Sequence, residues 1–407
     1  MKNSCKYIKL GDICEKITKG TTPSTYGYPF ISSGVNYIKA ESITKEGRIN
    51  PSSFVYISEE AHQKLKRSQI KLNDVLFTMA GIFLGKVAIL KDKSMLPANT
   101  NQAVAIIRIS YRCANPFYVY YFLQQDSITR YVNSSTGQSA QPNINLNEIS
   151  NLRIRLPSID IQNCIVNILR SLDDKIELNN KINRNLEAQA QAIFKSWFID
   201  FEPFKNGKFI DSELGKIPEG WKVGKLSDIA NITMGQSPNG NSYNEKKIGM
   251  IFFQGRAEFG WRFPRNRLYT TAPKRIAERD SVLLSIRAPV GDINKALERC
   301  CIGRGLASLT SNHKTFLYYK MQSIRHLLDV YNGEGTVFGS INKNTLQEIR
   351  TIIPIDSEII RFELKLKVVD ELIRNNYIEN LRLIKLRDTL LPELMSGKID
   401  ILRFSNR

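Results

Sequence analysis

The sequence predicts an α+β protein in which two similar globular domains are separated by two long antiparallel coiled-coil helices, an internal repeat with a pseudo-twofold axis. Three observations support this prediction. Within its 407 residues the chain contains the same short phrases twice, and the later phrases recur at a constant offset. Both copies also end in a long stretch with heptad periodicity.

The repeat is clearest near the start of each copy. Lys9–Ile13 recurs as Lys225–Ile229, and the turn Gly20–Pro23 recurs as Gly235–Pro238. Further pairs follow in the same order: Asp74–Thr78 with Ser281–Ser285, Asn143–Asn145 with Ser340–Asn342, Pro157 with Pro354, and Asp173 with Asp370. From Pro157 to Phe194 the offset stays at 197 residues without a gap. A gapless match predicts equal geometry in the two copies.

Each gapless stretch predicts a helix of roughly 35 residues, about 50 Å at 1.5 Å per residue. The seam residues are Ile165, Leu172, Asn179, Leu186 and Ile193 at one position, Ile168, Ile182 and Gln189 at the other, and Phe362, Val369, Asn376, Leu383 and Leu390 in the second copy. Polar Asn179 and Asn376 occupy equivalent seam positions, which can fix the register of a coiled coil. Because the second helix must return to pair with the first, the two should be antiparallel. The alternative is that each amphipathic helix packs only on its own domain.

These patterns divide the chain into five segments. Residues 1–156 form the first globular domain, 157–200 the central coiled-coil helix, 201–219 a connector, 220–354 the second domain and 355–400 the C-terminal coiled-coil helix. Both domains contain short β-like runs separated by Gly and Pro turns, whereas the connector is rich in Gly, Pro and charge. We therefore expect a compact mixed domain before each helix.

The charge balance favours a polyanionic partner. The chain has 58 Lys and Arg against 39 Asp and Glu, a formal net charge of +19 with a pI near 9.6. This excess points to nucleic acid, with a membrane surface as the alternative. Without a run of about 18 apolar residues or a secretory signal, we expect a cytoplasmic protein with no membrane partner. Six scattered cysteines and three histidines indicate no disulfide framework, no metal site and no cofactor.

Several longer phrases carry a family resemblance. They are Lys195–Phe204 with Asp211–Trp221, Ser285–Asp292 with Cys300–Ala307, Leu390–Asp400, and Pro97–Val104. With these phrases the chain resembles, over nearly its whole length, the specificity subunits of type I restriction-modification enzymes. The resemblance implies a non-catalytic subunit in which each target-recognition domain binds one half of a bipartite double-stranded DNA site. It also implies that the paired helices bind two methyltransferase subunits, and that the full complex adds two restriction or motor subunits.

Candidate DNA-binding residues lie in loops of both domains, because Arg, Lys, Asn and Gln reach base edges and phosphates. The candidates are Lys19, Thr21, Gln138, Gln141 and Asn143 in the first domain, and Gln236, Arg256, Arg262, Arg265 and Arg267 in the second. The four arginines alternate with aromatic residues, as on a nucleic-acid surface. The alternative is a solvated basic face with Trp261 and Phe263 in the core.

Other polar residues of these loops favour a structural role. Arg287 and Arg304 lie in the sequence segments that carry the family resemblance, whatever DNA each member binds. This favours a structural role or a contact with the DNA backbone over the reading of bases. Asn143 and Asn145 are also suited to capping the next element. The turns at Gly20 and Gly235 either bring backbone close to a phosphate or are plain structural turns.

The sequence does not favour an enzyme. It has no glycine-rich cofactor loop, no Asn-Pro-Pro-aromatic motif and no Gly-x-x-x-x-Gly-Lys-Ser/Thr motif. Asn115-Pro116-Phe117 is a helix start, and Asp356, Glu363 and Lys365 are solvated helix charges rather than a nuclease site. The alternative class is a protein-interaction scaffold with a coiled-coil spacer and no DNA, which salt-dependent DNA binding would exclude.

Overall fold

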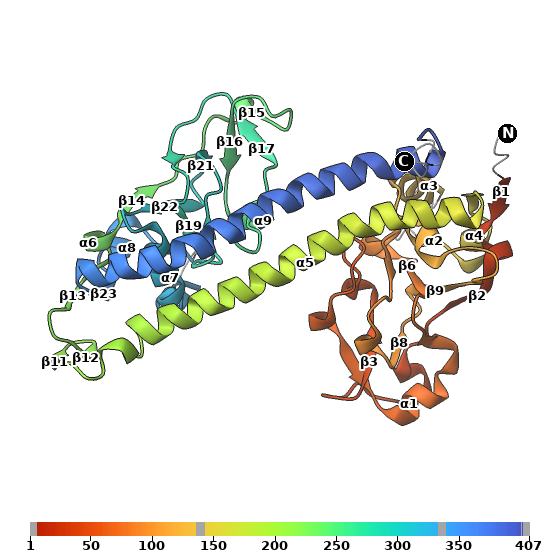
Figure 1. Ribbon diagram of the computed structural model, residues 1–407, viewed down its shortest axis with the longest axis horizontal. Helices are drawn as coiled ribbons and strands as arrows, with labels where there is room; N and C mark the ends of the chain where they lie inside the picture. Colours follow the sequence, from red (N-terminus) through yellow and green to blue (C-terminus); the bar gives the residue numbers. More distant parts are fainter. Residues whose placement is uncertain (1–5, 136–142, 333–338, 400, 402–407) are drawn as a thin grey trace. The chain divides into compact units, whose positions relative to one another are not determined.

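The computed structural model describes residues 6–135, 143–332, 339–399 and 401, and these form two compact units. The first unit comprises Met1–Glu177 with Asn380–Arg407, and the second comprises Leu178–Glu379. Each unit therefore contains part of both long helices, α5 (Ile159–Phe198) and α9 (Asp356–Ser396) (Figure 1).

The first unit contains two four-stranded sheets. One has the strand order β2-β9-β6-β7, with β2 Cys14–Lys19, β9 Val104–Ile109, β6 Val75–Thr78 and β7 Val87–Ile89. The other has the order β4-β3-β8-β5, with β4 Val55–Ile57, β3 Val35–Ile38, β8 Ala98–Thr100 and β5 Gln69–Ile70. Strands β1 (Lys6–Lys9) and β10 (Arg153–Leu156) form an antiparallel pair. The shorter helices are α1 Glu59–Lys64, α2 Pro116–Leu123, α3 Asp126–Ser135 and α4 Leu146–Ser150.

The second unit repeats this plan. Its first sheet has the order β14-β22-β19-β20, with β14 Asn231–Met234, β22 Leu306–Thr310, β19 Val282–Ser285 and β20 Ile293–Lys295. Its second has the order β15-β17-β16-β21-β18, with β15 Tyr243–Asn244, β17 Leu268–Thr270, β16 Met250–Phe253, β21 Cys300–Ile302 and β18 Ile276–Ala277. Strands β13 (Lys222–Lys225) and β23 (Arg350–Ile353) pair as β1 and β10 do. The shorter helices are α6 Leu226–Ile229, α7 Lys314–Ser323 and α8 Lys343–Gln347.

The structure confirms the internal repeat. In each unit an antiparallel sheet lies beside a sheet with one parallel pair, β3 with β8 and β16 with β21. The predicted helix start at Asn115 is also confirmed, since its side chain accepts a hydrogen bond from Phe117 N at 2.9 Å. Asn145 and Asn342 cap the matching helices α4 and α8.

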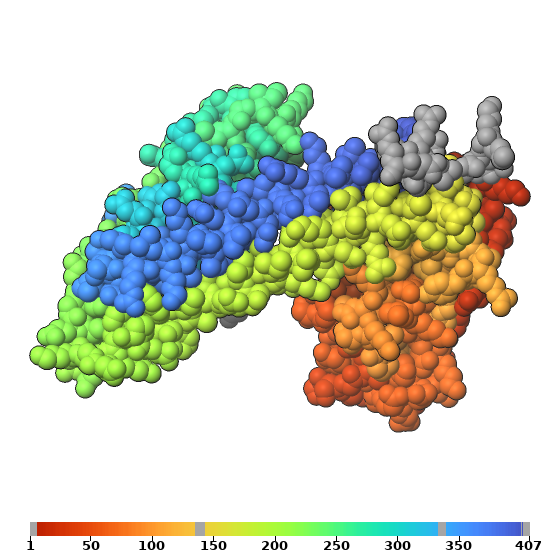
Figure 2. Space-filling model, viewed as in Figure 1, coloured from red at the N-terminus to blue at the C-terminus, as the bar shows by residue number. Residues whose placement is uncertain are grey.

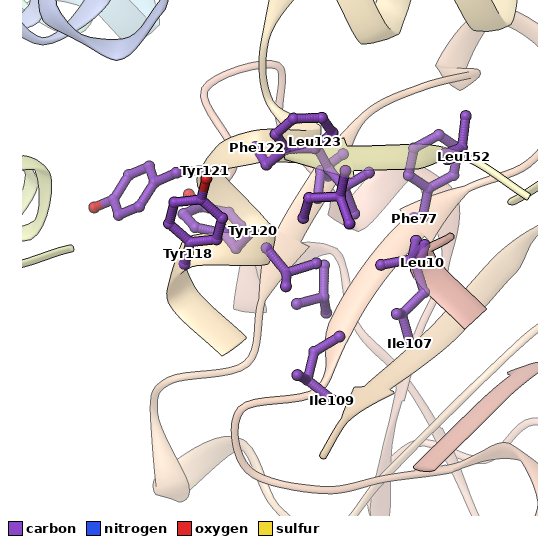
Figure 3. Packing of buried hydrophobic residues seen from close by; sticks show 14 of the residues in the cluster. Leu10, Phe77, Ile107, Ile109, Tyr118, Tyr120, Tyr121, Phe122, Leu123 and Leu152 are labelled. Carbon is purple, nitrogen blue, oxygen red and sulfur yellow. The ribbon is translucent and has the colours of Figure 1, made fainter. Parts of the chain in front are cut away.

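A tyrosine-rich helix anchors the core of each unit. In the first unit Tyr118, Tyr121 and Phe122 of α2 pack with Phe77 and Ile107 of the sheet (Figure 3). Leu391, Leu394 and Met395 of α9 belong to the same core. In the second unit α7 packs likewise against the sheet and both long helices. The helices are thus part of each hydrophobic core and not only spacers.

The long helices are antiparallel in both units. In the first, Arg387 pairs with Asp173 at 2.8 Å. In the second, the Asn179 amide donates to Glu379 at 2.7 Å and the Asn376 amide donates to Asn183 at 2.9 Å. The residue numbers of the contacting pairs increase along α5 and decrease along α9, as they do in an antiparallel pair. The predicted polar positions Asn179 and Asn376 both lie in the contact between the helices, which confirms that prediction.

The predicted second seam position is wrong. Ile168 and Ile182 are exposed, whereas Leu169, Ile176 and Asn183 are buried. The apolar residues on the packed face of a helix are spaced three or four residues apart. After Ile165 the buried position at this spacing is Leu169, four residues later, and not Ile168, three residues later. Helix α9 lies at the surface of the second unit (Figure 2). Leu364 and Val368 are among its exposed residues.

The predicted connector contains regular structure. Strands β11 (Phe209–Ser212) and β12 (Gly215–Pro218) form an antiparallel hairpin. The rings of Phe201 and Phe204 pack on Trp221 at centroid distances of 5.5 and 5.0 Å. These ring contacts hold the start of the connector against Trp221.

Candidate nucleic-acid interface

A tight turn in the first domain holds Thr21 against the end of strand β8. Gly20 N donates to Val104 O at 3.2 Å, and Thr21 N donates to Thr100 O at 3.1 Å. A Cβ atom on Gly20 would lie 2.0 Å from Thr100 O, so only glycine allows this approach. Lys19, immediately before the turn, is exposed.

Arg67 joins this turn, and sequence reasoning missed it. Its Nη2 atom donates to Thr21 Oγ1 at 3.3 Å, and its side chain is exposed. The sequence does contain a sign of a DNA-binding segment here, the basic residues Lys64, Lys66 and Arg67. They lie more than forty residues from Thr21 along the chain. Only the fold brings the two segments together.

Asn143 lies on a second loop of the same domain. It forms an isolated antiparallel bridge with Ala80, and the next residue, Ile144, donates its N–H to Met79 O at 2.9 Å. Met79 N in turn donates to Ala103 O, so this loop borders the same Thr100–Val104 turn as Thr21. Gln138 and Gln141 lie outside the described residues.

The second domain has the same loop arrangement. Gly235 N donates to Leu306 O at 2.9 Å, and Gln236 N donates to Ile302 O at 3.0 Å. A Cβ atom on Gly235 would lie 2.1 Å from Gly303 O. Gln236 is exposed, and Arg287 bridges Ser340 as Ala80 bridges Asn143. Both domains therefore present a glycine turn beside a bridged loop.

Arg287 and Arg304 stand at this place in the second domain. Both side chains are exposed, and neither guanidinium has a hydrogen bond or ion pair within the described part of the chain. The Arg304 backbone N–H donates to Ser237 Oγ at 3.3 Å, which fits the structural role expected for its backbone. Their side chains are nevertheless available to a phosphate.

Arg256 belongs to a neighbouring charged cluster. It pairs with Asp292, and Arg325 pairs with the other oxygen of the same carboxylate at 2.7 Å. These residues line a cavity of about 600 Å³, together with Trp261 and side chains of α5 and α7. Two guanidinium groups thus share the carboxylate of Asp292, while Glu187, the other carboxylate of the cavity, pairs with Arg262.

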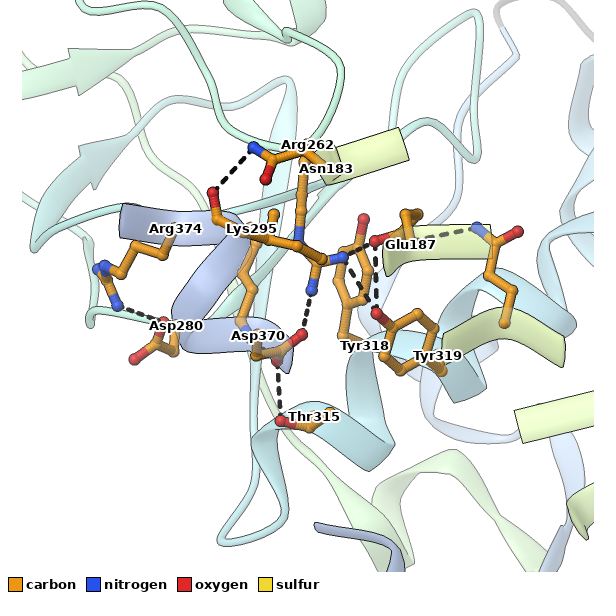
Figure 4. A network of polar contacts seen from close by, with 12 residues as sticks. Asn183, Glu187, Arg262, Asp280, Lys295, Thr315, Tyr318, Tyr319, Asp370 and Arg374 are labelled. Carbon is orange, nitrogen blue, oxygen red and sulfur yellow. Dashed lines mark hydrogen bonds and ion pairs between the residues drawn. The ribbon is translucent and has the colours of Figure 1, made fainter. Parts of the chain in front are cut away.

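Arg262 is not at the surface, which differs from the expectation for a base-reading arginine. Its side chain is 1% exposed and pairs with Glu187 of α5 and with Asp370 of α9, the latter at 2.5 Å (Figure 4). Lys295 also pairs with Asp370, at 2.7 Å. Burial alone would lower the pKa of Arg262, but the adjacent tyrosines and Asp370 hold it above its usual value, so the guanidinium stays charged. A buried charge needs such partners, and Arg262 therefore connects its loop to both helices.

The remaining two candidate arginines are exposed. Arg267 pairs with Glu258 at 2.7 Å and with Glu245 at 3.3 Å. The Arg265 backbone N–H donates to Glu258 O at 2.7 Å, which fixes the loop on which its side chain stands. The alternative interpretation of this loop places both Trp261 and Phe263 in the core. Phe263 is buried, whereas Trp261 is exposed.

The enzyme-like residues serve other purposes. Glu363 is not a solvated charge, because it accepts a hydrogen bond from Phe316 N at 2.7 Å at the start of α7. Burial raises the pKa of Glu363 despite this bond. Within residues 6–135, 143–332, 339–399 and 401, no group of three or more His, Cys, Asp or Glu is placed to hold a metal ion. Over the same ranges, no helix has the length and apolar character needed to cross a membrane.

The chain thus contains two copies of one α+β domain with matching loops, each followed by a long helix. Residues 3–188 and 218–386 match the type I restriction modification DNA specificity domain, and the chain belongs to this family. It is 31% identical to the putative type I restriction enzyme MjaX specificity subunit of Methanocaldococcus jannaschii, over 97% of this chain and 93% of that protein. It is 27% identical to the MjaIX specificity subunit of the same organism, with the same coverage. The crystal structure of the type I restriction-modification S subunit from M. genitalium has the same fold, with a TM-score of 0.59 at 15% identity over 97% of both chains.

Proposed function

We propose that the chain is the DNA-binding specificity subunit of a type I restriction-modification complex and is not itself an enzyme. Each domain binds one half of a bipartite double-stranded DNA site, and the chain directs the methyltransferase and restriction subunits to that site. The observation that carries the proposal is the repeated loop arrangement, in which Gly20 and Gly235 turns lie beside bridged loops with exposed polar and basic residues. Two copies of one binding loop set are what a two-part site requires.

The proposed DNA-binding residues are those that the structure leaves accessible. In the first domain they are Lys19, Thr21 and Asn143, with Arg67 added, and Gln138 and Gln141 stay predictions. In the second they are Gln236, Arg256, Arg265 and Arg267, with Arg287 and Arg304 added. We leave Arg262 out because its guanidinium is enclosed by two carboxylates.

The partners and location follow from the proposed function. Two methyltransferase subunits bind the chain through the paired helices, and two restriction subunits join the full complex. We place the protein in the cytoplasm, where chromosomal DNA would be its ligand. The net charge of +19 supports a DNA-binding role over a protein scaffold without DNA, because such a scaffold has no need of a large positive excess.

Mapping methylated bases in the host, before and after deletion of the gene, tests the proposal. A bipartite methylated motif should disappear with the gene. Replacing residues Gly220–Ile353 with the matching region of a relative should then change one half of the motif and preserve the other. If both halves change, the two domains do not bind independently.

A second experiment tests the absence of catalysis. The purified chain is incubated with duplex DNA, S-adenosylmethionine, ATP and Mg²⁺. We expect no methylation and no cleavage without the other subunits, and activity of the chain alone would contradict this part of the proposal. DNA binding should weaken steeply as salt rises, whereas a protein scaffold would not bind DNA at all.

A further inference from the structure

Trp261 differs from the other tryptophans of the chain. The sequence has three, all in the second unit, and Trp197 and Trp221 are 7% and 3% exposed. Trp261 is 51% exposed. A large aromatic side chain in water forgoes the free energy of burial, about 25 cal/mol per Å² of apolar surface. An exposed tryptophan therefore calls for a reason.

The exposure of Trp261 does not come from a loosely held loop, because hydrogen bonds and ion pairs hold the residues on both sides of it. The Asn294 side chain accepts a hydrogen bond from Gly260 N at 3.1 Å and donates one to Gly260 O at 3.0 Å. Arg262 O accepts a bond from Lys295 N at 2.8 Å, and its guanidinium is locked between α5 and α9. The indole is thus held outward by a rigid support, which lowers the entropic cost of binding.

The ring of Phe263 adds a further anchor. It packs on Tyr377 of α9 at a centroid distance of 5.0 Å and is buried. Residues 260, 262 and 263 therefore all face fixed partners, and Trp261 alone among these four consecutive residues is exposed. The sequence alternates aromatic and charged residues here, but only the contacts show which of them point outward.

The surroundings of Trp261 contain two exposed arginines that share one carboxylate, while the other carboxylate of the cavity, Glu187, is paired with the buried Arg262. Arg256 and Arg325 line the same cavity and share the single carboxylate of Asp292. Their side chains are 45% and 53% exposed, so both can also reach an anion. Gln191 of α5 contributes a polar amide to the cavity. An aromatic face in one cavity with two partly exposed guanidinium groups matches the bases and phosphates of a nucleic acid.

We propose that Trp261 stacks on a nucleobase of the half-site bound by the second domain, while Arg256 and Arg325 contact the adjacent phosphate. The proposal rests on the proposed function and adds a contact residue to it. Large side chains that pack against base steps open the stack and change the shape of the duplex. Trp261 would thus help the second domain to distinguish base steps that open readily from those that do not.

Tryptophan emission of the unaltered full chain gives the first test. The probe is a short duplex with the methylated motif found in the host, and the comparison duplex has the second half of the motif scrambled. Because Trp197 and Trp221 are buried, a change of emission on binding reports on Trp261. Stacking on a base should quench the emission with the first duplex and less with the second.

Binding measurements on three variants give the second test. Trp261→Ala should weaken binding of the motif duplex by roughly 5- to 150-fold, the range expected for one base–aromatic stack. Trp261→Phe keeps an aromatic face and should lose much less, while the DNA-dependent quenching disappears. Ile248→Ala is the matched control, since Ile248 is a 55% exposed apolar residue of the same unit, and it should bind like wild type. Circular dichroism confirms that each variant folds.

The outcomes separate this proposal from the proposed function. If the wild-type chain binds the motif duplex without quenching and Trp261→Ala binds equally well, the stacking contact is refuted and the DNA-binding role stands. If Trp261→Ala keeps its DNA affinity but loses co-purification with the methyltransferase subunits, the indole is a protein contact and the proposal is wrong. If the wild-type chain binds no duplex, both proposals fail.

Discussion

Replacing Arg262 with Met should destabilise the second unit by about 3 kcal/mol, the lower end of the range for breaking a buried ion pair. The substitution keeps the length of the side chain and removes the charge that Glu187 and Asp370 share. Asp370 retains Lys295 at 2.7 Å and Thr315 at 2.8 Å, so its carboxylate stays paired. Glu187 keeps only hydrogen bonds to neutral groups, which include the Tyr319 hydroxyl at 3.3 Å. The cost therefore comes mainly from Glu187.

Equilibrium unfolding followed by tryptophan emission measures this loss directly, because the tryptophans all lie in the second unit. A loss of about 3 kcal/mol corresponds to a fall of roughly 6 to 12 °C in the midpoint of thermal unfolding for a unit of this size. Arg256→Met is the matched control, since its pair with Asp292 is partly exposed and should contribute less than about 1 kcal/mol. Equal losses in the two variants would refute the reasoning.

The pH dependence provides a further check on the same substitution. Burial alone would raise the pKa of Asp370, but Lys295 and Arg262 hold it below its usual value. Such a carboxylate stabilises the fold above the pKa it has in the unfolded chain, about 4, and loses this contribution as the pH falls. Without Arg262 the pKa of Asp370 rises, so Asp370 of the variant binds a proton at a higher pH than in the wild type. The difference in unfolding free energy between wild type and Arg262→Met should therefore shrink below about pH 4.

Five further substitutions have defined outcomes. Burial lowers the pKa of Lys320 to about 8, so Lys320→Met should stabilise the fold by up to about 3 kcal/mol at pH 7 and by less at pH 10, as unfolding at the two pH values would show. Arg287→Ala and Arg304→Ala should each weaken binding to all DNA sequences alike and reduce the slope of log affinity against log salt by about 1, whereas loss confined to one sequence would indicate a base contact. Arg265→Ala should cost about 1 to 3 kcal/mol and relax one half of the motif if the side chain grips a guanine edge. Arg67→Ala should weaken recognition of the first half-site only, and an effect on the second half would contradict its placement.

The fold could be predicted from the sequence wherever the two copies check each other. Because the segment Lys9–Ile13 recurs as Lys225–Ile229, the sequence alone predicts that the two segments fold in the same way. The capping of α4 and α8 by Asn145 and Asn342 follows from the preference for Asn at helix N-termini. The hairpin at β11 and β12 could not be predicted in this way. It has no second copy, and the contact of its Phe209 ring with Phe201, at a centroid distance of 6.1 Å, is not revealed by composition.

The candidate site was harder to predict because the direction of a side chain in a loop depends on distant partners. Arg256, Arg262 and Arg267 look alike in sequence, yet Arg262 alone of these three meets Glu187 and Asp370, which lie 75 and 108 residues away along the chain. Arg67 reaches Thr21 through an approach of two segments that local patterns do not encode. Sequence reasoning located the loops but not which of their charges face outward.

The two copies pair the matching carboxylate of the long helices in different ways. Asp173 and Asp370 occupy matching positions on the long helices. Asp173 accepts a hydrogen bond from the Tyr121 hydroxyl at 2.7 Å and pairs with Arg387 of α9. Asp370 instead pairs with Arg262, which comes from a loop of the second domain. The first unit takes its cation from the other helix, whereas the second takes it from the domain itself.

This difference predicts unequal tolerance to domain exchange. When residues Gly220–Ile353 are replaced, Glu187 and Asp370 remain on the helices, and the incoming domain must supply an arginine for them. A chimera without it should lose about 3 kcal/mol of unfolding free energy, and adding Glu187→Gln should restore much of this, because a neutral amide costs less to bury than an unpaired carboxylate. Exchange of residues 1–156 carries no such requirement, since Asp173 and Arg387 both stay in place. Unfolding of the two chimeras, with and without Glu187→Gln, measures the difference, and a second-domain chimera that lacks the arginine but is as stable as the parent would show that Arg262 does not hold its domain to the helices.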